Sequence, residues 1–480
     1  MWQRHIGSSG EGGGSPGVPS ASSAARHPGS GAWTDRLGGS PRLTTCDHGV
    51  VEERVHDEAL RTDSRTDVWD VLVVGGGPAG ASAAYWLAER GHRVLVVEKK
   101  RFPRDKTCGD GLTPRAVRQL VDMGLEEPLS GYQRMDGLRS IAHGVTLELE
   151  WPDHPEFPSY GYVVRRRELD EMVADRAVKA GATLWPATEA VEPLVEDGRV
   201  VGAVVTRKEV GTTEPVRARY LLVADGSNSR FGRALGTARD RSYPLGMAVR
   251  GYFRSPLHDE PWIESHLDIR DRNGQALPGY AWIFPVGDGT INVGVGLLST
   301  FQGWKDINTS HLMEAFCETA PKRWGISPDT SCGAPTGGKL PTGFAVKPSI
   351  GPNWLTAGDA LGSVNPFNGE GISLAYETGR IAADALDQAL RTGDPSALQR
   401  YPERLEEIYG LYYKVARTFV RAIGNPAVMR ELTRIGFRSR TLMEWVLRIM
   451  ANLMRPDERG GAEIAYKMVA QVVRFTPEPK

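Results

Sequence analysis

One short segment constrains the fold of this chain more than any other. Residues 71–74 are wholly apolar and meet a turn with glycines at positions 75, 77 and 80, and residues 81–90 have helix-forming composition. A second apolar run, residues 94–97, ends in Glu98. A strand, a glycine turn, a helix and a second strand that ends in an acid form the βαβ unit that binds dinucleotides. The sequence predicts such a unit here, and an ordinary glycine turn is the simpler alternative.

The residues of this turn have distinct physical roles in a dinucleotide site. Gly75 permits the tight turn, Gly77 lets the backbone approach a pyrophosphate, and Gly80 lets the helix pack close to the strand. The first N–H groups of the helix, around Ala79, and the positive end of its dipole favour phosphate. Glu98 can accept hydrogen bonds from ribose hydroxyls. We therefore expect these five residues to bind the cofactor.

The charge of the chain is balanced, with 58 basic and 59 acidic residues among 480. This balance argues against a protein that binds nucleic acid through its net charge. The four cysteines form no Cys-x-x-Cys pair, so we expect no metal site. Residues 71–88 are uncharged, but the Gly-Gly-Gly-Pro at 75–78 would break a membrane-spanning helix. The first ten residues lack the apolar core of a secretory signal, so we expect a cytoplasmic protein.

Three further motifs follow in a fixed order along the chain. They are Ala-Asp-Gly-Ser-Asn-Ser-Arg at 224–230, Leu-Thr-Ala-Gly-Asp-Ala at 355–360 and Phe-Asn-Gly-Glu-Gly-Ile at 367–372. Together with the βαβ unit they resemble the flavoprotein hydroxylase superfamily, which has a glutathione-reductase-like FAD fold. The resemblance implies FAD as cofactor, held by Asp225, by Asp359 at the ribityl or ribose hydroxyls, and by the backbone of Gly371 and Ile372. The alternatives are a plain turn at Asp225 and a helix N-cap at Asp359.

Two segments indicate one branch of that superfamily. Residues 102–115 read Phe-Pro-Arg-Asp-Lys-Thr-Cys-Gly-Asp-Gly-Leu-Thr-Pro-Arg, and residues 278–285 read Pro-Gly-Tyr-Ala-Trp-Ile-Phe-Pro, followed by Asn-Val-Gly-Val-Gly at 292–296. They resemble the geranylgeranyl reductase family, in particular its actinobacterial menaquinone reductases. The resemblance implies that the flavin lies beside Cys108, Gly109, Gly111 and Arg166 (Arg167 being a competing assignment) and that Tyr280 and Trp282 face the substrate.

The same residues also have simpler interpretations. Cys108 could simply be a small buried apolar residue, as free cysteines often are. An arginine at 166 or 167 could simply belong to a charged helix surface. An aromatic stripe such as Tyr280, Trp282 and Phe284 is often plain core, although side chains two apart on a strand share one face.

The resemblance implies an α/β fold: a glutathione-reductase-like FAD-binding Rossmann domain interleaved with a mixed-sheet α+β substrate domain, followed by C-terminal helices. We expect helices at 165–180 and 371–390 and strands at 200–206, 217–224 and 354–359. The expected boundaries are a disordered tail at 1–66, an FAD-binding domain at 67–109 with 160–235 and 340–392, a substrate domain at 110–159 with 236–339, and a helical region at 393–480.

Helical periodicity is expected at 409–420 and 429–454, and the segment 411–450 is strongly basic. The segment contains eight lysines and arginines, and its only acidic residues are Glu431 and Glu444. A basic amphipathic helix is typical of a peripheral membrane-binding surface, here the inner face of the cell membrane. A helical cap with a solvated basic face is the alternative.

The implied function is an FAD-dependent reductase that saturates an isoprenoid C=C bond of a prenyl quinone, menaquinone first, or of a prenyl lipid. Hydride would come from reduced flavin, with Cys108, Tyr280 or a water as the proton donor and Trp282 facing the developing positive charge. No second glycine fingerprint lies between a strand and a helix, so NADPH would bind transiently, and a ferredoxin or quinol donor stays open. The rival functions are an FAD-dependent monooxygenase or halogenase and a non-enzymatic flavin or prenyl carrier.

Overall fold

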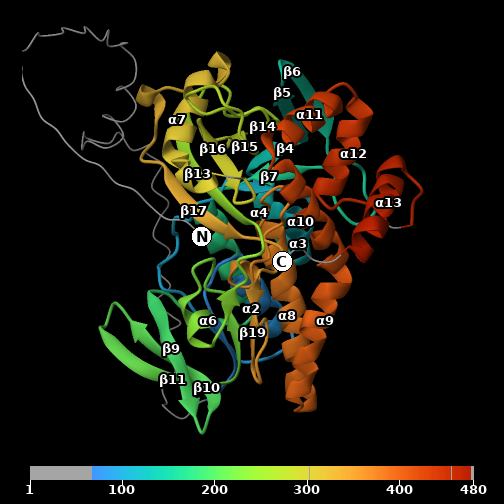
Figure 1. Ribbon diagram of the computed structural model, residues 1–480. Coiled ribbons are helices and arrows are strands. Elements are labelled where there is room, and N and C mark those ends of the chain that lie inside the picture. The colour runs from blue at the N-terminus through green and yellow to red at the C-terminus, as the bar shows by residue number, and fades with distance from the viewer. Residues whose placement is uncertain (1–67, 302, 456, 477–480) are drawn as a thin grey trace, which may run out of the picture.

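The computed structural model describes residues 68–301, 303–455 and 457–476. The tail expected at 1–66 lies outside the described residues. The described chain forms two large sheets with helices packed around them (Figure 1). The predicted α/β class, with its Rossmann unit, mixed sheet and C-terminal helices, is confirmed.

The first sheet is built on the predicted βαβ unit. Its parallel part runs in the order β8, β2, β1, β11, β19. The long strand β11 also pairs with β10, and β10 with β9, in the antiparallel ribbon that projects at the lower left of Figure 1. The strands are β1 (Trp69–Val74), β2 (Val94–Val97), β8 (Thr183–Trp185), β9 (Thr188–Glu196), β10 (Arg199–Arg207), β11 (Thr212–Val223) and β19 (Trp354–Thr356).

Alternating side chains of β1 enter two different cores. Val71 and Val73 pack with the helices on one face, whereas Leu72 and Val74 pack with the apolar side chains of β2 and β9–β11 on the other. The helices of the first core are α2 (Pro78–Ala88), α5 (Arg166–Lys179) and α8 (Ile372–Thr392), with α3 (Pro114–Asp122) beside α8. The expected helices at 165–180 and 371–390 are therefore confirmed as α5 and α8.

The second sheet is antiparallel except where β14 and β5 run parallel. Its order is β17, β13, β16, β15, β14, β5, β6. Tyr280, Trp282 and Phe284 lie on one side of β15, which we call the front face, and Ile283 lies on the back face under α7 (Thr309–Thr319). The strands are β5 (Gly137–Ala142), β6 (Val145–Glu150), β13 (Leu245–Arg254), β14 (Trp262–His266), β15 (Gly279–Pro285), β16 (Thr290–Leu298) and β17 (Thr336–Pro341).

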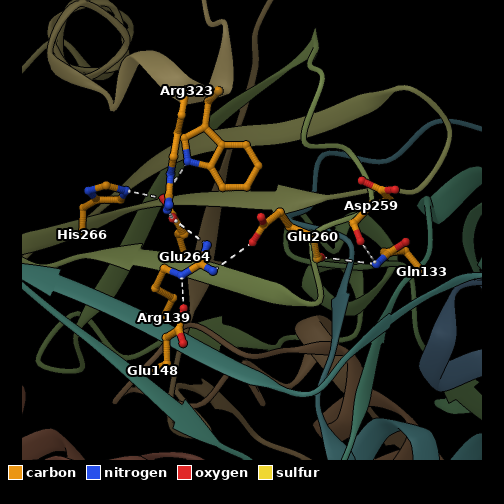
Figure 2. A network of polar contacts seen from close by, with 9 residues as sticks. Gln133, Arg139, Glu148, Asp259, Glu260, Glu264, His266 and Arg323 are labelled. Atoms are coloured by element: carbon orange, nitrogen blue, oxygen red, sulfur yellow. Dashed lines mark hydrogen bonds and ion pairs between the residues drawn. The ribbon is translucent and has the colours of Figure 1, made fainter.

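The back face also carries a buried network of charges around Glu264 (Figure 2). One oxygen of its carboxylate, Oε1, accepts hydrogen bonds from Arg139 and Arg323, and the other, Oε2, accepts from Trp324 at 2.8 Å and contacts His266 at 3.2 Å. Burial alone would raise the pKa of Glu264, but the contacts with His266 and Arg323 lower it. Both oxygens of this carboxylate are therefore fully used inside the protein.

The C-terminal helices cover the end of β6 and the side of α8 (Figure 1). They are α9 (Arg400–Leu405), the π-helical turn η7 (Glu406–Gly410), α10 (Leu411–Ile423), α11 (Pro426–Gly436), α12 (Arg440–Met450) and α13 (Gly461–Phe475). The helical segment expected at 429–454 is divided between α11 and α12, because the chain breaks after Gly436 and Ser439 caps a new helix by accepting the N–H of Leu442. None of the described helices has the length and apolar content needed to cross a bilayer.

The remaining elements are short. A small sheet joins β3 (Gly111–Leu112), β7 (Gly161–Val163) and β4 (Gln133–Met135), and β12 (Ala238–Arg239) pairs with β18 (Val346–Lys347). The others are α4 (Glu126–Leu129), α6 (Arg230–Ala234), η2 (Trp304–Asp306), η3 (Lys322–Trp324), η4 (Pro328–Thr330), η5 (Gly358–Ala360) and η6 (Pro395–Gln399).

Candidate active site

The turn after β1 is packed so tightly at two of its glycines that no side chain fits there. A Cβ on Gly75, whose φ is +103°, would lie 2.5 Å from the carbonyl oxygen of Ala224, and a Cβ on Gly80 would lie 1.9 Å from that of Gly75. At Gly77 the nearest atom is an Arg104 nitrogen at 3.5 Å. Gly77 is also the N-cap of α2, so the first turn of this helix has no side-chain cap. This surface can therefore accept a phosphate group.

Glu98 and Arg166 meet in one buried network. Glu98 Oε2 accepts the N–H of Gly76 at 3.0 Å and lies 3.5 Å from Arg104 Nη2. Arg104 Nη1 lies 2.9 Å from Asp170 Oδ2, and Arg166 donates two hydrogen bonds to the same carboxylate, at 2.7 and 2.8 Å. Arg166 is therefore buried rather than part of a charged helix surface.

Arg167, the competing assignment, is exposed. Arg104 was missed by the sequence reasoning, although it lies in the segment 102–115 that carries the family resemblance.

The late motifs pack directly onto the glycine turn. A Cβ on Gly358, at φ +61°, would lie 2.8 Å from Ala79 Cβ, and one on Gly379 would lie 2.3 Å from the carbonyl oxygen of Ala79. Gly371 is the N-cap of α8, and Asp359 Oδ1 is 3.7 Å from the position of a Cβ on Gly371. Segments almost 300 residues apart therefore converge at the N-terminal ends of α2 and α8, where Ile372 begins α8.

Asp225 follows Ala224, which contacts Gly75. Its Oδ2 accepts the N–H of Phe231 at 3.2 Å, so the side chain closes the turn before α6. Its Oδ1 is buried and has no hydrogen-bond partner among the described residues. Asp225 is thus both a turn residue and a buried acceptor that is free to bind a ligand.

The loop at 108–111 lies against the front face of the second sheet. Cβ atoms on Gly109 and Gly111 would lie 3.2 and 3.1 Å from the ring of Phe284. Asn292 ties the loop to the stripe: it accepts the indole N–H of Trp282 at 2.9 Å and donates to the carbonyl oxygen of Cys108 at 2.9 Å. The aromatic stripe thus borders the loop that carries Cys108.

Asn292 also donates to Asp110 Oδ2, at 2.8 Å, and the Tyr252 hydroxyl donates to the same oxygen. Asp110 is buried, has a φ of +66° and leaves Oδ1 without a partner among the described residues. Sequence reasoning gave no role to Asn292 or Asp110. The available signal was a polar residue, Asn292, in an otherwise apolar strand.

Tyr280 links the stripe to the late motifs. Its hydroxyl donates to the carbonyl oxygen of Asn368 at 2.7 Å, just before Gly371. Burial raises the pKa of Tyr280 to about 12. Burial also raises the pKa of the Cys108 thiol, although the charge of Arg166 opposes the rise. Both groups therefore keep their protons at neutral pH.

These residues fit a bound FAD. The glycine turn leaves space beside Gly77, and four buried polar atoms around it and around the 108–111 loop have no hydrogen-bond partner within the part of the chain that the structure describes. They are Arg104 Nε, Asp110 Oδ1, Asp225 Oδ1 and Glu370 Oε2. Because buried polar groups are normally paired, such a cluster indicates a ligand.

Comparison with known proteins agrees with this geometry. The family model described as an FAD binding domain matches residues 68–264. The chain is 41% identical over 409 residues to a menaquinone reductase of Mycobacterium tuberculosis, covering 85% of this chain and 97% of that protein. It is 33% identical over 364 residues to digeranylgeranylglycerophospholipid reductase 2 of Methanopyrus kandleri, covering 72% of this chain and 85% of the relative.

Two solved structures share the fold. A geranylgeranyl bacteriochlorophyll reductase-like protein of Thermoplasma acidophilum superimposes with a TM-score of 0.68 at 22% identity, over 84% of this chain and 99% of that one. A flavin-dependent brominase superimposes with a TM-score of 0.65 at 19% identity, over 85% of this chain and 100% of that one. At these identities the likeness concerns the fold alone.

The fold and the relatives define an FAD-dependent oxidoreductase of the flavoprotein hydroxylase superfamily. Within it, the chain belongs to the geranylgeranyl reductase family, together with the menaquinone reductases and digeranylgeranylglycerophospholipid reductases.

Proposed function

We propose that this protein saturates one C=C bond in the isoprenoid tail of a prenyl quinone, menaquinone being the first candidate, or of a prenyl lipid. The observation that carries the proposal is the 41% identity to a menaquinone reductase across 97% of that relative's length. An aromatic face formed by Tyr280, Trp282 and Phe284 beside the Cys108 loop supports it, because a polyprenyl chain offers only apolar contacts.

The residues divide the task between holding the cofactor and handling the alkene. When bound, FAD in its reduced form supplies the electron pair that the alkene receives. We propose that Gly75, Gly77, Ala79, Gly80, Glu98, Asp225, Asp359, Gly371 and Ile372 hold it, and that Cys108, Gly109, Gly111 and Arg166 line its ring.

An isolated alkene is a poor acceptor, so protonation must lead or accompany its reduction and builds positive charge at the tertiary carbon. We propose that Trp282, whose indole N–H donates to Asn292, faces that charge. The candidate proton donors are the Cys108 thiol, the Tyr280 hydroxyl and a water.

Anaerobic turnover separates this function from its rivals. Purified protein is incubated without oxygen with dithionite and menaquinone. Because dithionite also reduces the quinone ring to the quinol, the extract is then reoxidised in air, and the resulting quinone is analysed by mass spectrometry for hydrogens gained in its tail. A reductase yields a product heavier by two hydrogens. A monooxygenase or halogenase, the alternative function that the brominase-like fold permits, gives product only with oxygen. A carrier never changes the substrate mass.

Substitution distinguishes the two side-chain candidates. The variants are Cys108→Ala and Tyr280→Phe, with Cys108→Ser as the conservative control. The donor's variant should lose turnover by roughly 10²–10⁴-fold, as expected for a general acid, while its flavin absorbance stays that of the wild type. Wild-type turnover in both Cys108→Ala and Tyr280→Phe would contradict both assignments and leave water as the source of the proton.

For the electron donor, we propose NADPH, bound transiently. A ferredoxin or a quinol is the alternative. Stopped-flow reduction of the bound flavin by each donor, followed at its visible absorbance, decides among them.

We also propose that the C-terminal helices dock on an anionic bilayer, from which a long prenyl chain must be taken. Two helices carry exposed apolar stripes at helical spacing: Val428, Leu432 and Ile435 on α11, and Ile464, Met468, Val472 and Phe475 on α13. Exposed arginines accompany them, among them Arg434, Arg438 and Arg474. Exposed apolar area flanked by cations is what an anionic membrane surface binds.

The flotation test uses exposed residues because η7 and α10 belong to the core, in which Tyr409, Tyr412 and Tyr413 are buried. The variant Met468→Asp/Val472→Asp should lose flotation with phosphatidylglycerol vesicles and still bind FAD. The matched control is Val191→Asp/Val195→Asp, which changes valines of β9 that are 51% and 54% exposed. Flotation lost equally in both, or in neither, would contradict the docking surface.

A further inference from the structure

A cationic pocket lies beside the flavin-lining loop, and apart from Arg166 none of the residues proposed to hold FAD lines it. It has a volume of about 510 Å³ and is bounded by residues 105–107, the start of α5 and strands β13 and β17. Among the side chains that line it, Asp105 is the single acid. The cations are Lys100, Lys106, Arg165, Arg166, Arg167 and Arg250.

Most of these cations form no ion pair with another described residue. Arg166 pairs with Asp170 and Arg165 with Asp288. Lys100, Lys106, Arg167 and Arg250 form no ion pair with any described carboxylate within 4.0 Å.

Arg250 is the most demanding of the four. It is only 7% exposed, its Nε has no hydrogen-bond partner among the described residues, and its guanidinium donates only a 3.4 Å hydrogen bond to the carbonyl oxygen of Lys106. It also lies 4.4 Å from the ring centroid of Tyr252. The charge of Arg250 opposes the rise that burial causes in the pKa of Asp110, but the two side chains form no ion pair within 4.0 Å. A buried guanidinium with no direct ion pair is costly, so a ligand with several negative charges fits the pocket.

The position of the pocket narrows the choice of ligand. Lys106 and Thr107 directly precede Cys108, and Arg166 joins the pocket to the Glu98 network. The pyrophosphate of FAD is assigned in our proposal to Gly77 and the start of α2, where Gly77 is an N-cap without a side-chain hydrogen bond. A flavin must be reduced by a donor that binds next to it, and a dinucleotide donor is a polyanion. The sequence contains no second glycine fingerprint for such a dinucleotide, so its phosphates need another site.

We infer that this pocket binds the phosphate groups of a nicotinamide dinucleotide that reduces the flavin, with Lys106, Arg167 and Arg250 as its main contacts. In that reaction a hydride leaves the nicotinamide with its electron pair and passes to the bound FAD, and the dinucleotide departs oxidised. The inference rests on the proposed function for its second half-reaction, the reduction of the prenyl chain.

Calorimetric titration of the FAD-loaded protein with NADP⁺ tests the inference. The variant Lys106→Ala/Arg167→Ala should weaken the Kd by at least about tenfold, since it removes two charge-assisted contacts. The control Lys179→Ala/Arg199→Ala loses the same charge at two exposed sites outside the pocket and should bind NADP⁺ like the wild type. Raising the salt concentration should weaken the wild type more than the pocket variant.

Three results would overturn the inference. The pocket variant could bind NADP⁺ as tightly as the wild type, it could lose FAD instead, which would assign the pocket to the flavin, or it could lose binding of phosphatidylglycerol vesicles with NADP⁺ binding intact. Dithionite keeps the two proposals apart: it should restore prenyl reduction to the pocket variant. If dithionite drives no prenyl reduction even in the wild type, the proposed function fails while the NADP⁺ titration still stands.

Discussion

The two faces of the second sheet use buried polar groups in opposite ways. On the back face, the four groups around Glu264 saturate both of its oxygens. On the front face, Asp110 Oδ1 and Arg250 Nε are buried with no partner among the described residues, next to Trp282 and the Cys108 loop. A network in which every polar group is paired contributes to structure, whereas buried polar groups without a hydrogen-bond partner indicate where a ligand binds. Substitutions on the back face should therefore change stability, and those on the front face should change function.

The largest effect is expected at Glu264. Glu264→Ala leaves Arg139, Arg323 and Trp324 without their acceptor and should lower the free energy of unfolding by about 3–5 kcal/mol. Urea unfolding measures the change, and the FAD affinity of the folded fraction should stay that of the wild type. Glu148→Ala is the control, because Glu148 also pairs with Arg139 but is 46% exposed, and it should cost less than about 1 kcal/mol. A Glu264 variant that is stable but cannot bind FAD would reverse the roles of the two faces.

A smaller effect is expected at Gly294, under the indole of Trp282. A Cβ at this position would lie 2.2 Å from Trp282 Cζ2 and 2.6 Å from the carbonyl oxygen of Val249, so Gly294→Ala must displace the ring and shift the strand slightly, which should cost about 1–3 kcal/mol. Because the ring faces the site, turnover should fall by more than the loss of folded protein explains. Gly296→Ala is the matched control, since its Cβ would meet only contacts of 3.8 Å. Equal turnover in the two variants would argue that Trp282 does not face the substrate.

The smallest expected effect is a pH dependence of stability that comes from Glu168 on α5. Burial raises the pKa of Glu168 from 4.5 to about 7, with Arg165 opposing and Asp288 adding to the rise. The folded protein then binds a proton that the unfolded chain has released, so stability falls as pH rises from 4.5 to 7. Glu168→Gln should therefore gain stability relative to the wild type between pH 5 and pH 8 in urea unfolding.

Glu189 is the control with the opposite sign. A hydrogen bond from Lys208 lowers the pKa of Glu189, so its contribution to stability is present above pH 4.5 and is lost as pH falls below that value. Glu189→Gln should thus be less stable than the wild type at pH 8, and the difference should vanish in acid. The same trend in both variants would show that Glu168 is not held in its neutral form.

The parts of the fold that depend on local pattern were predicted from the sequence. The expected helix at 165–180 is α5, and the strands expected at 200–206 and 217–224 are β10 and the second half of β11. Local glycine chemistry also indicated the turn at Gly75, where a side chain would meet Ala224.

The parts that depend on distant contacts were not predicted. Arg104 meets Asp170 only when α5 packs on the first sheet, and Asn292 of β16 meets Asp110 only when the 108–111 loop packs on the second sheet. Arg417 was counted in a basic surface, but it is buried, lies 4.6 Å from the ring centroid of Tyr243 and donates to the carbonyl oxygen of Gly343. Helical periodicity also continues across residues 437–439, where the capping of α12 by Ser439 divides the helix.

The most direct test of this account is an experimental structure of the protein with FAD and a menaquinone bound. The account predicts the flavin ring beside the Cys108 loop and the isoprenoid tail against Trp282, on the front face of the second sheet. A flavin or tail bound on the back face, near Glu264, or a ring remote from Trp282, would contradict it.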